Sequence, residues 1–223
     1  MGCQKQYCFS KVPIFQNLKV HEMEKISRII THHHFDKGEI ILFAGDRKKK
    51  LFIVRHGRAK VSHISTDGRE YVMRILEVGD FFGDVTLFND EPQKSTVEAL
   101  EKMEICSLDG KELMKILAGT PITLFHMLAQ LSARLEETEN HLSEAISKEV
   151  SERLAAFILK SANSAKSDTF LLTLSKKDLA SLLNTTRETL SRRLSTFQKK
   201  GYIEMAGKNI KIINHAALEN LLL

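Results

Sequence analysis

The sequence has no tryptophan, three prolines and three cysteines among its 223 residues. So few cysteines exclude a disulfide scaffold, and so few prolines exclude a collagen-like chain. No apolar run approaches the roughly 18 residues that a membrane span requires, and the first residues, MGCQKQYCFSK, lack the apolar region of a signal peptide. We therefore expect a cytoplasmic protein without membrane contact, whose cysteines are thiols, redox switches or ligands rather than structural bridges.

The composition is that of an ordinary globular protein, with 43% hydrophobic and 27% charged residues. A length of 223 residues predicts one or two domains. Residues 1–150 carry 21 basic and 22 acidic side chains, whereas residues 151–223 carry 12 basic and 6 acidic ones, a net charge of +6. This excess predicts that the last third contacts a polyanion, although charge alone is equally consistent with a solvated basic surface.

Short apolar segments separated by glycines fill most of the first half. The segments are rich in Ile, Val, Phe and Leu, and they cover Glu39–Ala44, Leu51–Val54, Ala59–Ile64 and Glu70–Leu76. Regular turn glycines between such segments are typical of an antiparallel barrel or sandwich and not of βαβ units. A short amphipathic helix is predicted before them, around Val20–Ile30.

A different period begins near Pro121. Seven residues follow alternating steps of four and three for three heptads: Leu124, Leu128, Leu131, Leu135, Thr138, Leu142 and Ala145. This spacing is typical of a coiled-coil seam and predicts a parallel homodimer formed through one long helix. The alternative is that the helix packs along its own domain.

The last third has the pattern of a winged helix-turn-helix. The predicted elements are a helix over Glu149–Ser161, a polar loop, a strand over Phe170–Leu174, a helix from Ser175 to Leu183, a second helix from Thr186, and strands over Tyr202–Ala206 and Asn209–Ile213. Ser175 and Asp178 are spaced as an N-terminal capping pair. Asn184 and Thr185 are predicted to form the turn, with Thr185 as the cap of the second helix. The last two strands form the hairpin of the wing.

The second helix carries the candidate DNA-reading side chains. Leu190, Leu194 and Phe197 share one face, and the opposite face carries Arg187, Glu188, Ser191 and Arg192. Base-reading residues cluster at the N-terminal part of a recognition helix because that part enters the major groove. Arginine donates two hydrogen bonds to guanine, glutamate accepts from cytosine, and serine does either. Arg193 and Lys199 flank this face and suit phosphate contacts.

A capping role competes with this interpretation of Glu188. Glu188 stands three residues after Thr185, which is the spacing of a capping box on an ordinary solvated helix. The winged pattern and the basic charge favour the DNA-reading interpretation.

The stretch LSKKDLASLLNTTRETLSRRLSTFQKKGYI resembles the DNA-binding domain of the CRP/FNR family of bacterial transcription regulators, and the resemblance extends from VPIFQNL at Val12 to the C-terminus. It implies an α+β fold with a β-roll of the cyclic-nucleotide-binding type over residues 1–118, a coiled-coil dimerisation helix over 119–147, and a winged helix-turn-helix over 148–223. It further implies a homodimer that regulates transcription by binding double-stranded DNA at a palindromic operator, with RNA polymerase as a further partner.

The resemblance also assigns roles to the candidate readers. Glu188 and Arg192 match the family's shared readers of a TGA-type half-site. Ser191 matches the serine of FNR-like members, whereas Arg187 matches the arginine of CRP-like members. The outer base of each half-site therefore stays open.

The segment FFGDVTLFNDEPQKSTVEA resembles the phosphate-binding cassette of cyclic-nucleotide domains. Cassettes that bind cyclic AMP have Gly-Glu and Arg-Ser pairs where this sequence has Gly83-Asp84 and Lys94-Ser95. Lys94 offers a point charge in place of a planar fork, and Asp84 is one methylene shorter than glutamate. Thr138 matches the adenine-contacting position, but Glu139 follows it in place of a hydroxyl residue.

These departures predict a cassette that does not bind cyclic AMP. It is then either a retained fold element or a site for another small effector. The alternative function is a regulator gated by a cyclic nucleotide or another effector in the β-roll.

The cysteines of this sequence match positions that FNR uses as ligands of its iron–sulfur cluster. Cys8 and Cys106 match two of them and Cys3 a third, but the cluster needs four ligands and the chain has three thiols. The pattern is closer to the FNR-like proteins (Flp) of Gram-positive bacteria, which implies a redox disulfide between Cys8 and Cys106 as a switch. The alternatives are a buried, purely structural Cys106, or a metal or cluster with a ligand other than cysteine.

No other pattern indicates a metal site or an enzyme. His32, His33 and His34 cannot close one tetrahedral site because adjacent strand residues point to alternating faces, and we expect a solvated connection between helix and strand there. No nucleophile–base arrangement or P-loop is present, so no catalytic residue is assigned. A third possibility beside the two regulators is a cyclic-nucleotide-binding adaptor that does not bind DNA.

Overall fold

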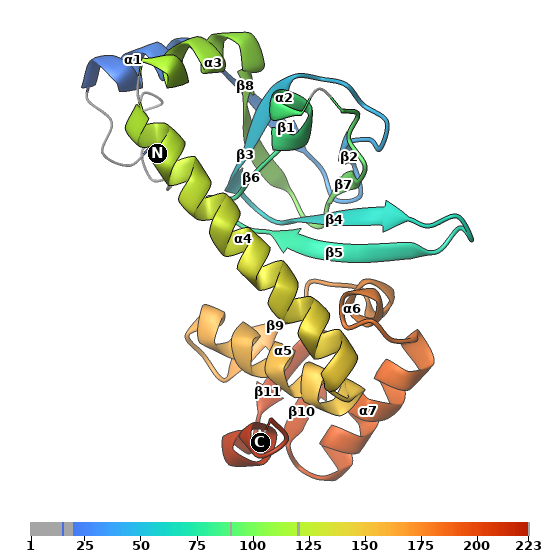
Figure 1. Cartoon of the computed structure of the whole chain (residues 1–223). Helices are drawn as coiled ribbons and strands as arrows, with labels where there is room; N and C mark the ends of the chain where they lie inside the picture. The colour runs from blue at the N-terminus through green and yellow to red at the C-terminus, as the bar shows by residue number, and fades with distance from the viewer. Residues whose placement is uncertain (1–14, 16–19, 90, 120, 223) are drawn as a thin grey trace. The chain divides into compact units, whose positions relative to one another are not determined.

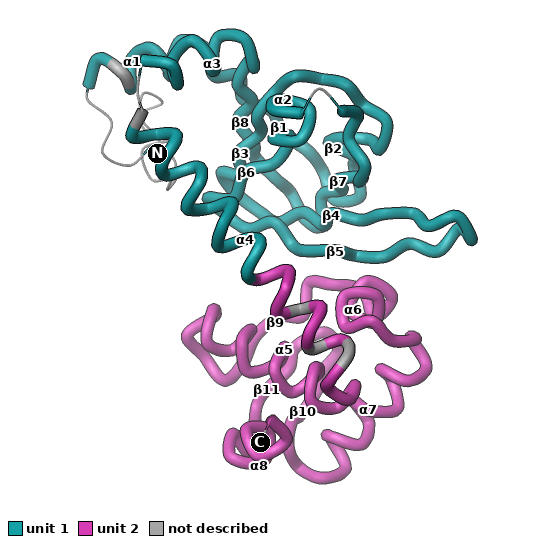
Figure 2. The backbone as a smooth tube through the Cα atoms, in the orientation of Figure 1, with its two compact units in different colours: residues 1–136 teal, residues 137–223 magenta. Residues whose placement is uncertain are grey.

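The computed structural model of this protein describes Phe15 and residues 20–89, 91–119 and 121–222. The chain divides into two compact units, residues 1–136 and residues 137–223, which Figure 2 colours separately. The boundary falls inside helix α4 (Pro121–Ser147), the long helix that the seam pattern predicts.

The first unit contains two four-stranded antiparallel sheets with helices around them (Figure 1). Its elements before α4 are α1 (Val20–Ile29), β1 (Ile30–Phe35), β2 (Ile40–Leu42), β3 (Lys50–His56), β4 (Ala59–Ile64), β5 (Glu70–Leu76), β6 (Phe81–Phe82), α2 (Asp84–Phe88), β7 (Thr96–Ala99), β8 (Met103–Asp109) and α3 (Gly110–Ala118). The strand orders are β1-β8-β3-β6 and β2-β7-β4-β5. The predicted antiparallel sandwich is confirmed.

Alternation along β3 builds a core on each face of its sheet. Phe52 and Val54 pack among residues of the other sheet. Leu51 and Ile53 belong to a second cluster, which draws side chains from α1, α3 and α4. Because both faces are covered, four consecutive residues of β3 are buried, which explains why this strand has a continuous apolar run in the sequence.

Helix α4 buries one face and exposes another apolar face. Thr123 and Met127 are 1% and 2% exposed, and Leu131 packs partly against the second cluster. The remaining leucines of the predicted seam are exposed by 42% to 63%: Leu124, Leu128, Leu135 and Leu142. The predicted alternative of packing along its own domain is therefore realised for part of the helix, and the homodimer stays a prediction. The helix leaves a stripe of leucines uncovered.

The second unit combines the end of α4 with the four helices and three strands of a helix-turn-helix domain and its wing. Its further elements are α5 (Val150–Ala165), β9 (Thr169–Leu171), α6 (Lys176–Leu182), α7 (Arg187–Lys199), β10 (Ile203–Ala206), β11 (Asn209–Ile212) and α8 (His215–Glu219). The three strands form an antiparallel sheet in the order β10-β11-β9. The hairpin of β10 and β11 turns at Gly207, which has a φ of 63°, and it is the predicted wing.

Three local predictions differ from the structure. The three consecutive histidines lie in strand β1 and not in a connection, because pairing with β8 already begins at Ile30. Helix α5 continues to Ala165, through half of the segment expected as a polar loop, and ends at Lys166 with a φ of 52°. The strand expected over Phe170–Leu174 is shorter and covers Thr169–Leu171.

Within the described part of the chain, no single helix is long and apolar enough to cross a membrane. The helical segments Gly110–Ala118 and Ile122–Asn140 are long and apolar enough only when they are taken together, and a bend of 114° separates them.

Candidate nucleic-acid interface and effector site

A reciprocal cap starts helix α6. The hydroxyl of Ser175 accepts a hydrogen bond from the backbone N–H of Asp178 at 3.0 Å and donates one to the Asp178 carboxylate at 2.6 Å. This arrangement confirms the capping pair that the spacing predicts. The cap holds the first helix of the motif in place ahead of the turn.

The turn between α6 and α7 contains a left-handed residue. Asn184 has a φ of 49°, a conformation that asparagine adopts more readily than most residues. The cap of α7 is Thr186, whose hydroxyl oxygen accepts from the N–H of Thr189 at 3.2 Å. The prediction of Thr185 as the cap is wrong by one residue, because the Thr185 N–H bonds back to the Ala180 carbonyl and still belongs to the turn.

This shift of the cap removes the competing interpretation of Glu188. In a capping box the acid stands three residues after the cap, and that position is Thr189 here. The Glu188 side chain is exposed in the first turn of α7 and forms no hydrogen bond or ion pair with the residues that the structure describes. Its carboxylate can therefore accept from an external donor.

Helix α7 separates an apolar face from a polar face, as predicted. Leu190, Leu194 and Phe197 are 2% exposed or less and pack inward. On the other side, Arg187, Glu188 and Arg192 are exposed and Ser191 is half-buried. Since helix residues three and four apart are neighbours on one face, these polar groups form one surface over the first two turns.

A shallow hollow of about 420 Å³ follows the polar side of α7. Its lining residues are Ser191, Arg192, Ser195, Thr196 and Lys199. The Nη2 of Arg192 donates to the Thr189 hydroxyl at 3.4 Å, which directs the guanidinium toward the N-terminal turn. Sequence reasoning missed Ser195 and Thr196. Their spacing of three and four residues after Arg192 is the signal that places them on the same face.

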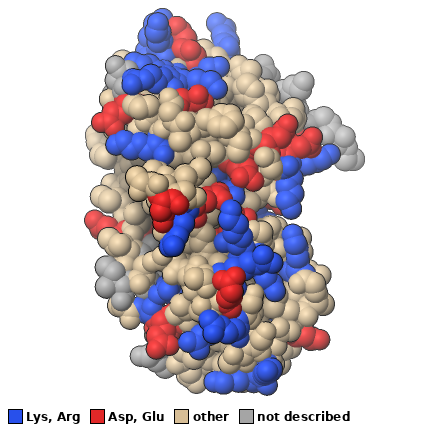
Figure 3. Space-filling view, turned by 90° about the vertical axis from the view of Figure 1, so that its right-hand side faces the viewer, with Lys and Arg blue, Asp and Glu red and all other residues tan. Residues whose placement is uncertain are grey.

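Basic side chains surround this surface. Arg193 and Lys199 are exposed at the positions expected for phosphate contacts. Lys208 and Lys211 are exposed in the wing, and Lys200 lies 5.7 Å above the ring of Tyr202. In the space-filling view of Figure 3, Lys and Arg side chains gather over this unit with acidic ones between them. Such a surface suits a polyanionic duplex.

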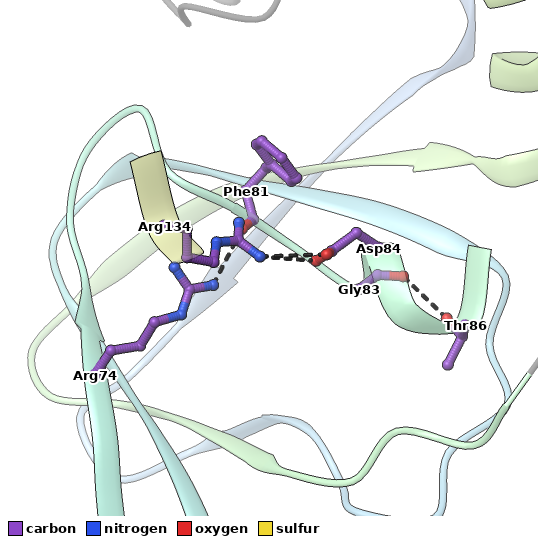
Figure 4. Close-up of polar contacts among 6 residues, drawn as sticks. All are labelled: Arg74, Phe81, Gly83, Asp84, Thr86 and Arg134. Carbon is purple, nitrogen blue, oxygen red and sulfur yellow. Dashed lines mark hydrogen bonds and ion pairs between the residues drawn. The ribbon is translucent and has the colours of Figure 1, made fainter. Parts of the chain in front are cut away.

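Two of the predicted effector residues lie at the start of α2 (Figure 4). Gly83 caps this helix with a φ of 86°, and a Cβ atom there would come within 2.5 Å of the Lys50 carbonyl oxygen. Glycine is therefore required at this turn. The Thr86 hydroxyl donates to the Gly83 carbonyl at 3.0 Å and to the Lys48 carbonyl at 2.8 Å. These contacts fix Asp84 as the first residue of α2.

Arg134 of α4 binds the carboxylate that the cassette would offer to a ligand. Its Nη1 donates to the two Asp84 oxygens at 3.2 and 3.3 Å, and its Nη2 donates to the Phe81 carbonyl at 2.9 Å. The guanidinium also lies 4.8 Å from the centre of the Phe81 ring, and Arg74 donates to the same carbonyl at 3.4 Å, as Figure 4 shows. Sequence reasoning missed Arg134. Its position one helical turn before Thr138 places it on the same helix face as that predicted effector residue, which could have indicated it.

The other predicted effector residues have different surroundings. The Lys94 ammonium is exposed and lies 2.9 Å from the Glu91 carboxylate, which raises the pKa of Lys94 by hydrogen bonding and charge attraction. Ser95 is half-buried beside it in the chain. Thr138 is exposed on α4 and belongs to the second unit.

Cys106 is buried in strand β8, with 2% of its surface exposed. Its sulfur lies 3.3 Å from Nδ1 of His32, the residue opposite it on β1. Cys3 and Cys8 lie outside the described residues, so the pairing of Cys8 with Cys106 stays a prediction.

The three consecutive histidines point to alternating sides of β1. His32 contacts Cys106, whereas the Nε2 of His33 lies 2.8 Å from the Ser107 hydroxyl. Burial, together with the positive charge of Lys50 and of neighbouring His34, holds the pKa of His33 below its ordinary value. Among the residues that the structure describes, no group of three or more His, Cys, Asp or Glu side chains is placed to hold a metal ion.

Comparison with known protein families assigns the two halves of the chain separately. The sequence model of the cyclic nucleotide-binding domain matches residues 32–120, and that of the Crp-like helix-turn-helix domain matches residues 152–221.

The chain is also similar to known proteins along most of its length. The chain is 34% identical to electron transport regulator A of Shewanella oneidensis, over 92% of this chain and 84% of that protein. It is 26% identical to the probable transcriptional regulator flp of Lacticaseibacillus casei, over 96% of this chain and 97% of that protein. Among solved structures, FixK2 from Bradyrhizobium japonicum superposes with a TM-score of 0.77 at 24% identity, over 86% of this chain and 97% of that chain. This likeness supports the fold.

Proposed function

This chain belongs to the CRP/FNR family of DNA-binding transcription regulators, and we propose that it acts as a homodimer that reads a palindromic TGA-type operator. The family consists of regulators and not of enzymes, and the helix-turn-helix is its DNA-binding element.

The observation that carries the proposal is the polar face of α7. Glu188 is exposed and not used as a cap, and Arg192 is exposed one turn further along the same face. A glutamate can accept from cytosine and an arginine can donate twice to guanine, so the pair can read a G·C base pair and its neighbour in the major groove. Arg187 and Ser191 lie beside them and are proposed to contact the outer bases. Arg193 and Lys199 are proposed to contact phosphates.

The exposed leucines of α4 support the homodimer. Leu128, Leu135 and Leu142 are 60% to 63% exposed at intervals of seven residues, which is the repeat of a coiled-coil seam. Leucines in such a row are expected to pair with the same row of a second copy. Two α7 helices would then reach half-sites about one helical turn apart, as a two-fold dimer on a palindrome requires.

Binding measurements with single-residue variants test this assignment. We expect Glu188→Ala and Arg192→Ala to abolish preference for a TGA-containing palindrome over a scrambled duplex, because each good base contact contributes about 1–3 kcal/mol and a dimer makes it twice. Fluorescence anisotropy at one fixed salt concentration measures both affinities.

Arg193→Ala is the matched control for Arg192→Ala, since it also removes a cation from α7. It should weaken binding to both duplexes by a similar factor and reduce the salt dependence. Unchanged operator affinity in Glu188→Ala or Arg192→Ala would refute this docking of α7.

We also propose that DNA binding does not depend on cyclic AMP. The Asp84 carboxylate is hydrogen-bonded on both oxygens by Arg134, and Lys94 faces Glu91. A lysine provides a point charge where a guanidinium would grip the cyclic phosphate with two parallel bonds. Calorimetric titration should show no binding at micromolar cyclic AMP. Micromolar binding that also raises operator affinity would favour the alternative, a regulator gated by a ligand in the β-roll.

Thiol control is the second regulatory proposal. Oxidised glutathione can convert Cys8 and Cys106 to a disulfide, accepting the two electrons and two protons that the thiols lose. Mass spectrometry after thiol alkylation should then detect a Cys8–Cys106 link and a change in operator affinity that Cys8→Ser prevents. Reduced thiols at both positions after oxidant treatment, with unchanged affinity, would dismiss the switch and leave Cys106 as a core residue.

A further inference from the structure

The side chain of Arg153, near the start of α5, hydrogen-bonds three backbone carbonyls from two separate segments of the second unit. Its Nε donates to the Leu183 carbonyl at 2.9 Å, and its Nη2 donates to the Asn184 carbonyl at 3.4 Å. Its Nη1 donates to the Lys148 carbonyl. Leu183 and Asn184 belong to the turn in front of α7, whereas Lys148 follows the last residue of α4. One guanidinium therefore connects the end of α4 to the turn of the helix-turn-helix.

Both attachment points lie at the C-terminal ends of helices. The last carbonyls of an α-helix have no donor within the helix and carry a partial negative charge. Helix α4 ends at Ser147 and helix α6 at Leu182, so the three acceptors lie one or two residues beyond these ends. The fixed fork of a guanidinium suits several acceptors at once, whereas a lysine ammonium is a single point of charge.

The turn itself is held mainly by contacts within the α6–α7 segment. The Asn184 N–H donates to the Ser181 carbonyl at 3.0 Å, and the Thr185 N–H donates to the Ala180 carbonyl at 2.9 Å. Both bonds tie the turn to α6. Arg153 adds a contact from outside this segment, at the exposed left-handed residue that sets the direction in which α7 departs.

We propose that Arg153 is a positioning residue for DNA recognition, which fixes the direction of α7 with respect to the end of α4. The role rests on the proposed function, because in a dimer paired along α4 the two recognition helices must stand at the spacing of two half-sites. Arg153 acts through the backbone of the turn and contacts neither base nor phosphate.

The test compares Arg153→Ala and Arg153→Lys with Lys160→Ala in the full-length protein. Lys160 is a matched control because it is an exposed cation on the same helix, paired with Glu137 at 2.9 Å. Fluorescence anisotropy at one salt concentration measures affinity for the palindrome, for the palindrome with one base pair inserted between its half-sites, and for a scrambled duplex.

We expect Arg153→Ala to bind the palindrome about tenfold more weakly than Lys160→Ala and to distinguish less between the palindrome and its inserted version. Arg153→Lys should recover only part of this loss. Affinity for the scrambled duplex should match that of Lys160→Ala, since both variants lose one charge. Amide hydrogen exchange over residues 183–187 should be faster in free Arg153→Ala than in free Lys160→Ala.

Two outcomes would overturn the role of Arg153. One is that Arg153→Ala keeps the wild-type affinity for the palindrome and the wild-type sensitivity to the inserted base pair. The other is equal weakening on all three duplexes, which is the result of losing folded protein and is checked by thermal unfolding. If Arg153→Ala does not fold, Arg153→Lys provides the same comparison. A wild-type protein that does not prefer the palindrome to the scrambled duplex would instead refute the proposed function, on which this role depends.

Discussion

At the scale of single residues, the chemistry of the cassette depends on which cation reaches Asp84. The family's pattern leads one to expect a ligand there, but Arg134 of α4 already donates to both carboxylate oxygens. The side chains are 23% and 14% exposed, so the pair is largely withdrawn from water. The attraction within such a pair adds little to folding stability. Removing one partner is nevertheless costly, because the other charge is then left unpaired in a poorly hydrated site.

A double-mutant cycle on this pair tests that interpretation. Arg134→Met alone should lower the free energy of unfolding of the first unit by about 2–3 kcal/mol, because it leaves the Asp84 carboxylate without its donor in a poorly hydrated site. Adding Asp84→Asn should recover part of this loss, with a coupling energy of about 1 kcal/mol or more. Chemical denaturation of the four proteins measures the cycle, and strictly additive effects would show that the contact does not couple the two residues.

His33 gives a pH dependence whose sign follows from its surroundings. Its pKa in the folded protein lies below the ordinary value of 6.5, so between these two values the unfolded chain binds more protons than the folded one. Stability should therefore rise with pH through this window, and it should fall as the pH is lowered below about 6.5.

Thermal unfolding between about pH 7.5 and 5.5 measures this effect. His33→Gln should flatten part of the slope, because it removes the group whose pKa is lowered in the folded protein. An identical slope in His33→Gln and the wild type would contradict the assignment to His33.

At the scale of secondary-structure elements, a buried lysine joins three strands of one sheet. Lys60 of β4 is 5% exposed, and its ammonium lies 2.9 Å from Glu70 of β5 and 3.2 Å from Glu98 of β7. Two carboxylates that converge on one site are tolerated only because the cation lies between them. The cluster therefore links β4 to both of its neighbouring strands.

Removing the cation should destabilise the sheet more than removing the whole cluster. We expect Lys60→Met to cost about 3 kcal/mol, because two partly buried carboxylates then face each other. The triple variant Lys60→Met, Glu70→Gln, Glu98→Gln should recover most of that loss. Denaturant titrations of the first-unit transition provide the comparison, and a triple variant less stable than Lys60→Met would contradict this account.

The elements were largely predictable from the sequence, whereas long-range contacts were not. The strands Ala59–Ile64 and Glu70–Leu76 are found as predicted because local alternation and turn glycines determine them. The cap of α7 was misplaced because adjacent threonines at 185 and 186 are equally able to cap, and only the fold decides between them. The contact between Arg134 and Asp84 was not predicted because the two residues lie 50 positions apart in the chain.

At the scale of the whole molecule, the leucine stripe of α4 is a row of apolar side chains that a single copy leaves uncovered. Leu128 and Leu135 are each 60% exposed, so charged substitutions there should change association without disturbing the core. We expect the wild type to sediment at twice the chain mass of 25.3 kDa and Leu128→Glu, Leu135→Glu to sediment as a monomer.

The double variant should also bind the operator more weakly than the wild type. Without the dimer, two separate monomers bind the two half-sites independently. Glu136→Lys is a suitable control, because it changes the charge of an exposed position on the same helix outside the seam. A double variant that remains dimeric would place the dimer interface elsewhere.

Selection of bound duplexes from a random pool tests the central claim most directly, because it does not presuppose an operator. The proposed dimer should enrich an inverted repeat with TGA in each half-site and half-site centres about one helical turn apart. The same selection with Glu188→Ala should lose the base preference while still recovering DNA in a salt-dependent manner. Enrichment of a single asymmetric site, or of no motif with the wild-type protein, would contradict the reading of a palindrome by paired α7 helices.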